Sequence, residues 1–269
     1  GSGGARMPTS DDETPLAGGN INAGVVRVAD TVRRSMSPNS GNVHRLLKQL
    51  ERWGLAYAPR FLGIDDSGRE ILSYMAGTAM IPETLWENTA ALTESATMLR
   101  KLHDATRSLD FVPDGNWAYT YPLAERNDVI CHNDFAPYNM IFRDGLPVAI
   151  IDFDLAGPGP HLRDLAYLAY WFAPLSFSSE DLAEPSARDL ANGSSRLKLL
   201  CSAYGTSDYV GLLDMVLEVL NHMGDETAVA KMVGRDAATR LQERGHFNHW
   251  KKEARSFNEN RPVIWRNLQ

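Results

Sequence analysis

The segment from His132 to Asp154 holds the side chains of this chain that are best suited to chemistry. It reads HNDFAPYNMIFRDGLPVAIIDFD, with Asn139 five positions after Asp134 and Asp152 thirteen positions after Asn139. Phosphoryl transfer from a nucleotide needs a carboxylate that accepts the proton of the attacking hydroxyl, and oxygen ligands for magnesium. The spacing H-x-D-x-x-x-x-N, followed by an aspartate at a strand end, matches these needs. The segment therefore predicts a phosphotransferase active centre.

Each polar residue of this segment receives a role from the chemistry that it can perform. Asp134 is the expected catalytic base, and His132 is expected to fix the loop that carries it. Asn139 and Asp152 are the expected magnesium ligands, and Asp154 is either a second metal contact or a solvent-facing carboxylate. Any one of these residues alone is equally typical of a polar turn. Their order between two strands favours the catalytic interpretation.

Strands must hold this loop, and the apolar pattern predicts where they lie. The short apolar runs DVICH, NMIF and PVAIID surround the loop, and Asp144-Gly145 between the last two is typical of a hairpin turn. Before them, residues 15–75 alternate β-type runs with one amphipathic segment, NVHRLLKQLERWG. This alternation predicts a small sheet with one helix.

Helices are expected around and after the catalytic segment. A long helix is predicted over 83–107, after the connector 76–82, because its leucines recur at helical spacing. The run 164–172 is apolar on nearly every side, which predicts a buried helix beneath the active centre. From 178 onward the sequence alternates further helical segments with loops.

The predicted elements define an α+β fold class with a two-lobed, protein-kinase-like arrangement. A small N-terminal antiparallel sheet with one helix is expected over 15–76, and a larger, mostly helical C-terminal lobe over 77–269. The N-terminal lobe is expected to bind the nucleotide, and the C-terminal lobe to carry catalysis and the acceptor. Residues 1–14 are interpreted as a cloning remnant and a mobile leader.

Composition excludes several classes of partner. The formal net charge of -7 argues against a nucleic-acid ligand, because phosphate backbones recruit basic surfaces. No apolar run is long enough to cross a membrane, and no export signal is evident. Cys131 and Cys201 are too few for a disulfide framework, so a cytoplasmic location is expected.

The motifs HNDFAPYN, IDFDLAGPGP and the following DLA together resemble the aminoglycoside phosphotransferase and choline kinase superfamily, whose members are small-molecule kinases related in fold to protein kinases. The resemblance implies transfer of the γ-phosphoryl group of ATP or GTP to a hydroxyl, with Mg²⁺ as cofactor. It also implies that Asp164 supports the catalytic loop from the helix that follows.

The same resemblance implies a set of nucleotide-binding residues in the N-terminal part: Gly18, Gly19 and Asn22 in a turn above the phosphates, Arg33 and His44 near them, and the backbone of Ser73 and Met75 at the adenine edge. Arg33 stands where the family usually has a lysine, and Val43 and His44 lie where its partner glutamate is expected. Either Arg33, with His44, replaces this lysine–glutamate pair, or the protein is a nucleotide-binding pseudokinase.

The acceptor is expected to bind among the helices after residue 178. Polycationic acceptors favour acidic pockets, yet residues 172–269 carry 13 acids and 12 bases. A small molecule with a hydroxyl, with antibiotics among the candidates, is the leading acceptor, and a serine or threonine hydroxyl of a peptide or protein is the alternative. Candidate pocket residues are Tyr204, Tyr209, His246, Trp250 and Trp265.

Overall fold

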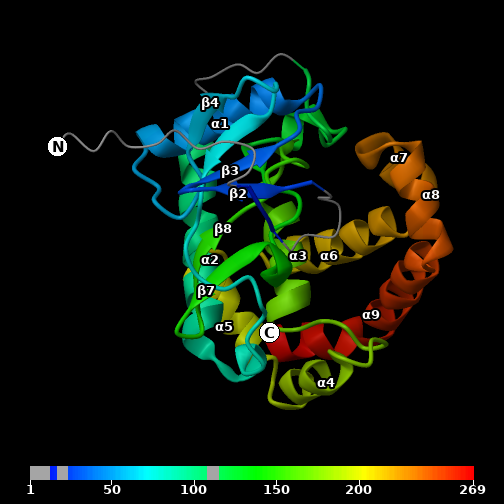
Figure 1. Cartoon of the computed structure of the whole chain (residues 1–269). Coiled ribbons are helices and arrows are strands. Elements are labelled where there is room, and N and C mark those ends of the chain that lie inside the picture. Colours follow the sequence, from blue (N-terminus) through cyan, green and yellow to red (C-terminus); the bar gives the residue numbers. More distant parts are fainter. Residues whose placement is uncertain (1–12, 17–23, 108–114) are drawn as a thin grey trace.

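The computed structural model describes residues 13–16, 24–107 and 115–269, and an antiparallel sheet occupies one end of it (Figure 1). This sheet has five strands in the order β1-β2-β3-β5-β4. The strands are β1 (Thr14–Pro15), β2 (Val26–Val28), β3 (Thr31–Arg34), β4 (Phe61–Ile64) and β5 (Glu70–Ser73). All of its pairings are antiparallel.

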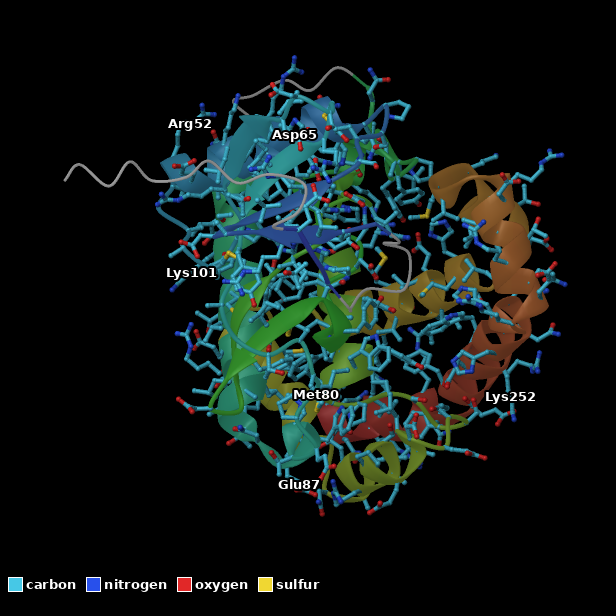
Figure 2. The ribbon with its side chains drawn as sticks, viewed as in Figure 1. Arg52, Asp65, Met80, Glu87, Lys101 and Lys252 are labelled. Carbon is cyan, nitrogen blue, oxygen red and sulfur yellow. The ribbon has the colours of Figure 1, made fainter. Side chains whose placement is uncertain are left out.

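Helix α1 (Ser40–Arg52) covers this sheet with one apolar face. Val43, Leu46, Leu47 and Leu50 recur at the three- and four-residue spacing of a single helix face, and all four are buried. The opposite face carries charged residues such as Arg52, which lies at the outside of the molecule in Figure 2. The predicted amphipathic helix is therefore confirmed.

The second long helix is shorter than the sequence predicted. The expected continuous helix over 83–107 is instead a 3-10 turn, η2 (Leu85–Glu87), followed by α2 (Thr89–Thr106). Asn88 separates them, because it adopts an extended conformation and its side chain accepts a hydrogen bond from the Ala91 N–H at 3.1 Å. Such capping by asparagine is typical of a helix start.

Two small antiparallel strand pairs enclose the catalytic segment. Strand β6 (Val129–Cys131) pairs with β9 (Gly157–Gly159), and β7 (Met140–Arg143) pairs with β8 (Leu146–Ile150). Asp144 and Gly145 both have positive φ, at 54° and 78°, as the predicted hairpin turn requires. The chain therefore returns after β8 to the loop that ends in the short 3-10 helix η4 (Pro137–Asn139).

Helices make up most of the remaining chain. They are α3 (His161–Phe172), α4 (Ala183–Ala191), α5 (Ser195–Tyr204), α6 (Tyr209–Met223), α7 (Glu226–Val233), α8 (Arg235–Glu243) and α9 (His246–Leu268). Helix α3 is buried on nearly every side, as predicted. Helices α7, α8 and α9, orange to red in Figure 1, curve along one side of the molecule. In the described ranges, none of the helices has the length and apolar character needed to cross a membrane.

The α+β fold class is confirmed. One apolar core runs through both parts and includes Val43 and Leu72 near the sheet as well as Leu102 and Leu165 among the helices. The boundary between lobes near residue 76 stays a prediction. A separate small core, formed by Val229, Ala238 and Phe247, joins α7, α8 and α9.

Candidate active site

Asp164, in the first turn of α3, holds the loop that begins at His132. Its carboxylate accepts hydrogen bonds from the backbone N–H groups of His132 and Asn133, each at 2.8 Å. A third bond, also 2.8 Å, comes from the ring of His103 on α2. Burial alone raises the pKa of Asp164, but these bonds and the charge of His103 lower it below its ordinary value. The geometry is that of a support for the loop.

His132 ties the loop to the chain that leaves β8. Its Nδ1 accepts a hydrogen bond from the backbone N–H of Asp134 at 3.1 Å, and its Nε2 lies 3.0 Å from the carbonyl oxygen of Ile151. Burial lowers the pKa of the ring, so the ring is neutral and Nε2 donates to Ile151. This placement matches the orienting role expected from the sequence.

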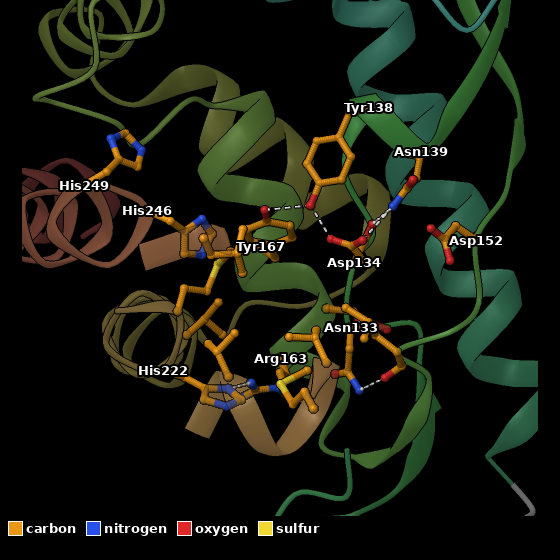
Figure 3. Close-up of a pocket in the computed structure, with 18 of the residues that line it drawn as sticks. Asn133, Asp134, Tyr138, Asn139, Asp152, Arg163, Tyr167, His222, His246 and His249 are labelled. Carbon is orange, nitrogen blue, oxygen red and sulfur yellow. Dashed lines mark hydrogen bonds between the residues drawn. The ribbon is translucent and has the colours of Figure 1, made fainter. Parts of the chain in front are cut away.

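Asp134 lies at the centre of a hydrogen-bonded group (Figure 3). Asn139 donates to its Oδ2 at 2.9 Å, and the hydroxyl of Tyr138 donates to its other oxygen. The Tyr138 hydroxyl also lies 2.9 Å from that of Tyr167 on α3. Burial raises the pKa of Asp134 to about 6. A carboxylate with a pKa near neutrality is suited to accept a proton.

Sequence reasoning missed Tyr138 and Tyr167 as members of this group. Tyr138 is part of the quoted motif HNDFAPYN, so its position beside Asp134 could have been suspected. Tyr167 lies three residues after Asp164 on α3, and residues at this spacing share a helix face. That face meets the catalytic loop only in the folded chain.

Asn139 and Asp152 line the same cavity as Asp134, whereas Asp154 is not part of its lining. Asp152 directly follows Ile151 and has φ 60°, a strained backbone for a non-glycine residue of the kind common at functional sites. The Asp154 carboxylate instead accepts a hydrogen bond from Arg34. Burial and the neighbouring Asp152 raise the pKa of Asp154.

The donor set fits a magnesium ion that is completed by substrate oxygens. No cluster of three or more His, Cys, Asp or Glu side chains able to hold a metal occurs in the parts of the chain that the structure describes. Asn139 and Asp152 offer an amide oxygen and a carboxylate. Magnesium at nucleotide sites takes one or two protein ligands of this hard type, together with phosphates and waters.

Arg34, and not Arg33, faces the carboxylates of Asp152 and Asp154. Arg34 lies 3.9 Å from Asp152 and lines a cavity of about 250 Å³ beneath the sheet, here called the strand cavity. Arg33 points to the other face of β3 and pairs with Asp65 at 3.4 Å. Successive side chains of a strand face opposite sides of the sheet. Arg34 therefore occupies the position, facing the cavity, that the sequence predicted for Arg33.

His44 contacts an acid that the sequence analysis did not consider. Its Nε2 lies 2.8 Å from the carboxylate of Glu70 on β5, and its ring stacks on Phe61 at 3.8 Å. Glu70 in turn lies 3.5 Å from Arg34. His44 is therefore linked to Arg34 through Glu70, an acid that lies on strand β5 and not on the helix.

Two of the other residues expected to bind the nucleotide, Ser73 and Met75, lie at the strand cavity. They line it together with Val32, Leu72 and Tyr74. The backbone N–H of Ser73 is already bonded to the carbonyl oxygen of Arg60 at 2.9 Å. The positions of Gly18, Gly19 and Asn22 lie outside the described residues.

A second cavity, of about 510 Å³, lies on the other side of Asp134, and we call it the loop cavity. Its inner wall carries Asp134, Asn139 and Asp152, and its outer wall carries His222, His246 and His249 (Figure 3). Of the five aromatic candidates for the acceptor pocket, only His246 lines it. The others lie elsewhere: Tyr204, for example, is buried against His103 at 2.7 Å.

The fold and this arrangement define a phosphotransferase whose candidate catalytic aspartate lies on a loop between two short antiparallel strand pairs. Residues 112–199 match the phosphotransferase enzyme family. A relative, the trifolitoxin immunity protein of Rhizobium leguminosarum bv. trifolii, is 34% identical over 225 residues, which cover 81% of this chain and 84% of the relative. The chain belongs to this family, within the superfamily of aminoglycoside phosphotransferases and choline kinases. It is a phosphotransferase.

Solved structures of low sequence identity share the fold. Ethanolamine kinase of Plasmodium vivax matches 96% of this chain and 85% of its own, with a TM-score of 0.60 and 14% identity. The ADP-bound aminoglycoside phosphotransferase APH(2'')-Ib matches 90% and 93%, with a TM-score of 0.55 and 14% identity. The resemblance noted in the sequence motifs is thus confirmed.

Proposed function

We propose that this protein transfers the γ-phosphoryl group of ATP, or of GTP, to a hydroxyl of a small molecule in a magnesium-dependent reaction. One observation carries the proposal: Tyr138 and Asp152 line both the strand cavity and the loop cavity, so the two cavities meet beside Asp134. A nucleotide in the first cavity and an acceptor in the second would present their reacting atoms to the same carboxylate.

The residues around Asp134 suggest how the reaction proceeds. The acceptor oxygen forms a bond to the γ-phosphorus as the bond from that phosphorus to the bridging oxygen breaks, and the hydroxyl proton passes to Asp134. Asn139 and Asp152 would hold Mg²⁺, which supplies charge neutralisation on the phosphates. Asn139 also orients Asp134 through its amide, and His132 and Asp164 keep the loop in place.

The N-terminal part would position the nucleotide. Arg34, with three carboxylates around it, is the cation best placed to contact the phosphates. Ser73 and Met75 would border the adenine, and the turn with Gly18, Gly19 and Asn22 is proposed to cover the phosphates. We also propose a cytoplasmic location, where nucleoside triphosphate is available.

The named relative suggests the biological purpose. Its name assigns it to immunity against trifolitoxin, and we propose that the present chain likewise protects a cell by phosphorylating a toxic small molecule. This role is extended from the relative. Resistance by phosphorylation requires only that the toxin carries a hydroxyl group that its toxic action depends on.

Calorimetric titration with ATP and GTP, with and without Mg²⁺, tests the proposal. Wild type is expected to bind nucleotide more tightly with Mg²⁺, and Asp152→Ala to lose this metal dependence. Asp134→Ala should keep nucleotide binding and lose transfer of labelled phosphate to acceptors. Glu259→Gln, an exposed change on α9, serves as the control. Absence of nucleotide binding by wild type would refute the proposal, and transfer only to peptide serine would favour a protein kinase.

A further inference from the structure

The loop cavity has an acidic inner wall and a basic, apolar outer wall. Its acids, Asp134, Asp152 and Asp164, all belong to the catalytic loop and its supports. Apolar side chains such as Met223 and Val233 line the wall formed by α6 to α9. The ionisable side chains on that wall are histidines and an arginine, Arg244. Such a wall offers no carboxylate to an amino group of an acceptor.

Arg163 is the most unusual residue of this cavity. It lines the cavity from α3 and is only 7% exposed. Its guanidinium stacks over the ring of Tyr119, 4.6 Å from the ring centre, and binds the Nδ1 of His222. Among the described residues no carboxylate forms an ion pair with it, whereas Arg34 pairs with Glu70, Asp152 and Asp154.

His222 does not neutralise this charge. Burial and the neighbouring Arg163 lower the pKa of His222 to about 4, so the imidazole is neutral at physiological pH. Arg163 therefore carries a buried positive charge beside a neutral ring. A buried charge without a counter-ion is costly, and the side-chain hydrogen bond that the guanidinium forms runs to the neutral ring of His222. The loop cavity thus contains a cation, Arg163, that could form an ion pair with an anionic group of a ligand.

We propose that the acceptor carries a carboxylate next to its hydroxyl-bearing part, together with an apolar body, and that Arg163 binds this carboxylate. The planar guanidinium matches a carboxylate through paired hydrogen bonds. The apolar body would lie against α6 and α7, and the hydroxyl would face Asp134. The inference rests on the proposed function, since it assigns the acceptor to the loop cavity. It excludes polycationic aminoglycosides as preferred substrates.

Matched pairs of ligands test this assignment. N-butanoyl-, N-octanoyl- and N-dodecanoyl-L-serine each carry a hydroxyl, a carboxylate and an apolar chain, and their amides lack only the negative charge. Binding is measured by calorimetry on full-length wild type saturated with Mg²⁺ and ADP. We expect at least one acid to bind at least about tenfold more tightly than its amide, as for a charge-assisted hydrogen bond. Kanamycin is expected to bind more weakly than either.

Variants separate the role of Arg163 from general damage. Arg163→Met is expected to abolish the preference for the acid, and Arg163→Lys to keep part of it. Arg266→Met removes an exposed arginine of α9 and should leave the preference unchanged. The wild-type comparison needs no variant, so it remains informative even if Arg163→Met fails to fold.

The outcomes also distinguish this inference from the proposed function. Equal binding of acid and amide, preferred binding of kanamycin, or no binding of any acid at millimolar concentration would overturn the inference. Phosphate transfer to amides or to aminoglycosides would support the proposed kinase activity. It would refute the proposal that the acceptor carries a carboxylate bound by Arg163. Conversely, a clear preference for the acid without any transfer would support the site and refute the catalytic proposal.

Discussion

Arg34 on β3 and Glu70 on β5 lie directly opposite each other in the sheet, with 3.5 Å between guanidinium and carboxylate. Burial by itself lowers the pKa of Arg34, but the carboxylates of Asp154, Asp152 and Glu70 raise it. Glu70 is itself bonded to His44 of α1. The acid that pairs with Arg34 therefore lies on a strand. Helix α1 contributes His44, which orients Glu70.

The first prediction concerns nucleotide affinity. Glu70→Gln removes one of the carboxylates that hold Arg34 in place, so we expect MgATP binding to weaken by about five- to thirtyfold, equivalent to about 1–2 kcal/mol. Arg34→Gln should weaken it at least as much. Calorimetric titration measures both. Arg33→Gln is the control, since Arg33 pairs with Asp65 on the other face; a larger effect there than at Arg34 would contradict the assignment.

A single-residue ambiguity explains why the sequence pointed to Arg33. Two consecutive arginines on a strand face opposite sides, and a shift of one position exchanges the faces. The register of β3 against β5 decides between them, because it places Arg34 opposite Glu70 and Arg33 opposite Ile71. That pairing joins residues far apart in the sequence.

The second prediction concerns the support of the catalytic loop. Asp164→Asn places an amide NH₂ where the carboxylate accepted backbone N–H groups, so one donor of the loop must face another donor. We expect a loss of about 2–4 kcal/mol in the free energy of unfolding. Urea denaturation at pH 7 measures it, with Asp236→Asn on the surface of α8 as the control.

The same variant has a defined pH dependence. The folded pKa of Asp164 is held below its ordinary value. Its contribution to stability is therefore present above the unfolded pKa of about 4 and is lost as the pH falls through the folded value. The difference between wild type and Asp164→Asn should stay constant from pH 8 to about 5 and narrow only in acid. A difference that shrinks near neutrality would argue against an ionised Asp164.

The third prediction concerns the close approach of β9 to the segment around Tyr119, which precedes β6 in the chain. A Cβ added to Gly157 would lie 1.7 Å from the carbonyl oxygen of Tyr119. Backbone must move to admit it, so Gly157→Ala is expected to lower the free energy of unfolding by at least about 2 kcal/mol. Gly41→Ala in α1 meets no atom within 4 Å and should be neutral or slightly stabilising. Thermal unfolding compares the two.

The fourth prediction concerns the ring beside Arg163. Its pKa of about 4 means that His222 should show no titration in ¹H–¹⁵N NMR spectra between pH 8 and 5. The unfolded chain takes up this proton near pH 6.5, so stability should decline as the pH falls from there toward 4. A midpoint near 6.5 for His222 would remove the basis for a lone charge at Arg163.

The catalytic segment could be predicted because its geometry is local. His132, Asp134 and Asn139 lie within one loop, and their spacing alone determines which hydrogen bonds they can form. Arg163 could not be identified in this way. It is adjacent to Asp164 and looks like part of an ordinary helix start, and its burial beneath Tyr119 and against His222 depends on contacts across the fold.

The separate core of α7, α8 and α9 has a consequence for how this protein diversifies. Val229, Ala238 and Phe247 hold these helices together without joining the main core. The same helices form much of the outer wall of the loop cavity. Substitutions in this region can therefore remodel what the enzyme accepts while the phosphate-transferring loop keeps its supports. A chain built in this way can change its acceptor by altering one flank of the loop cavity.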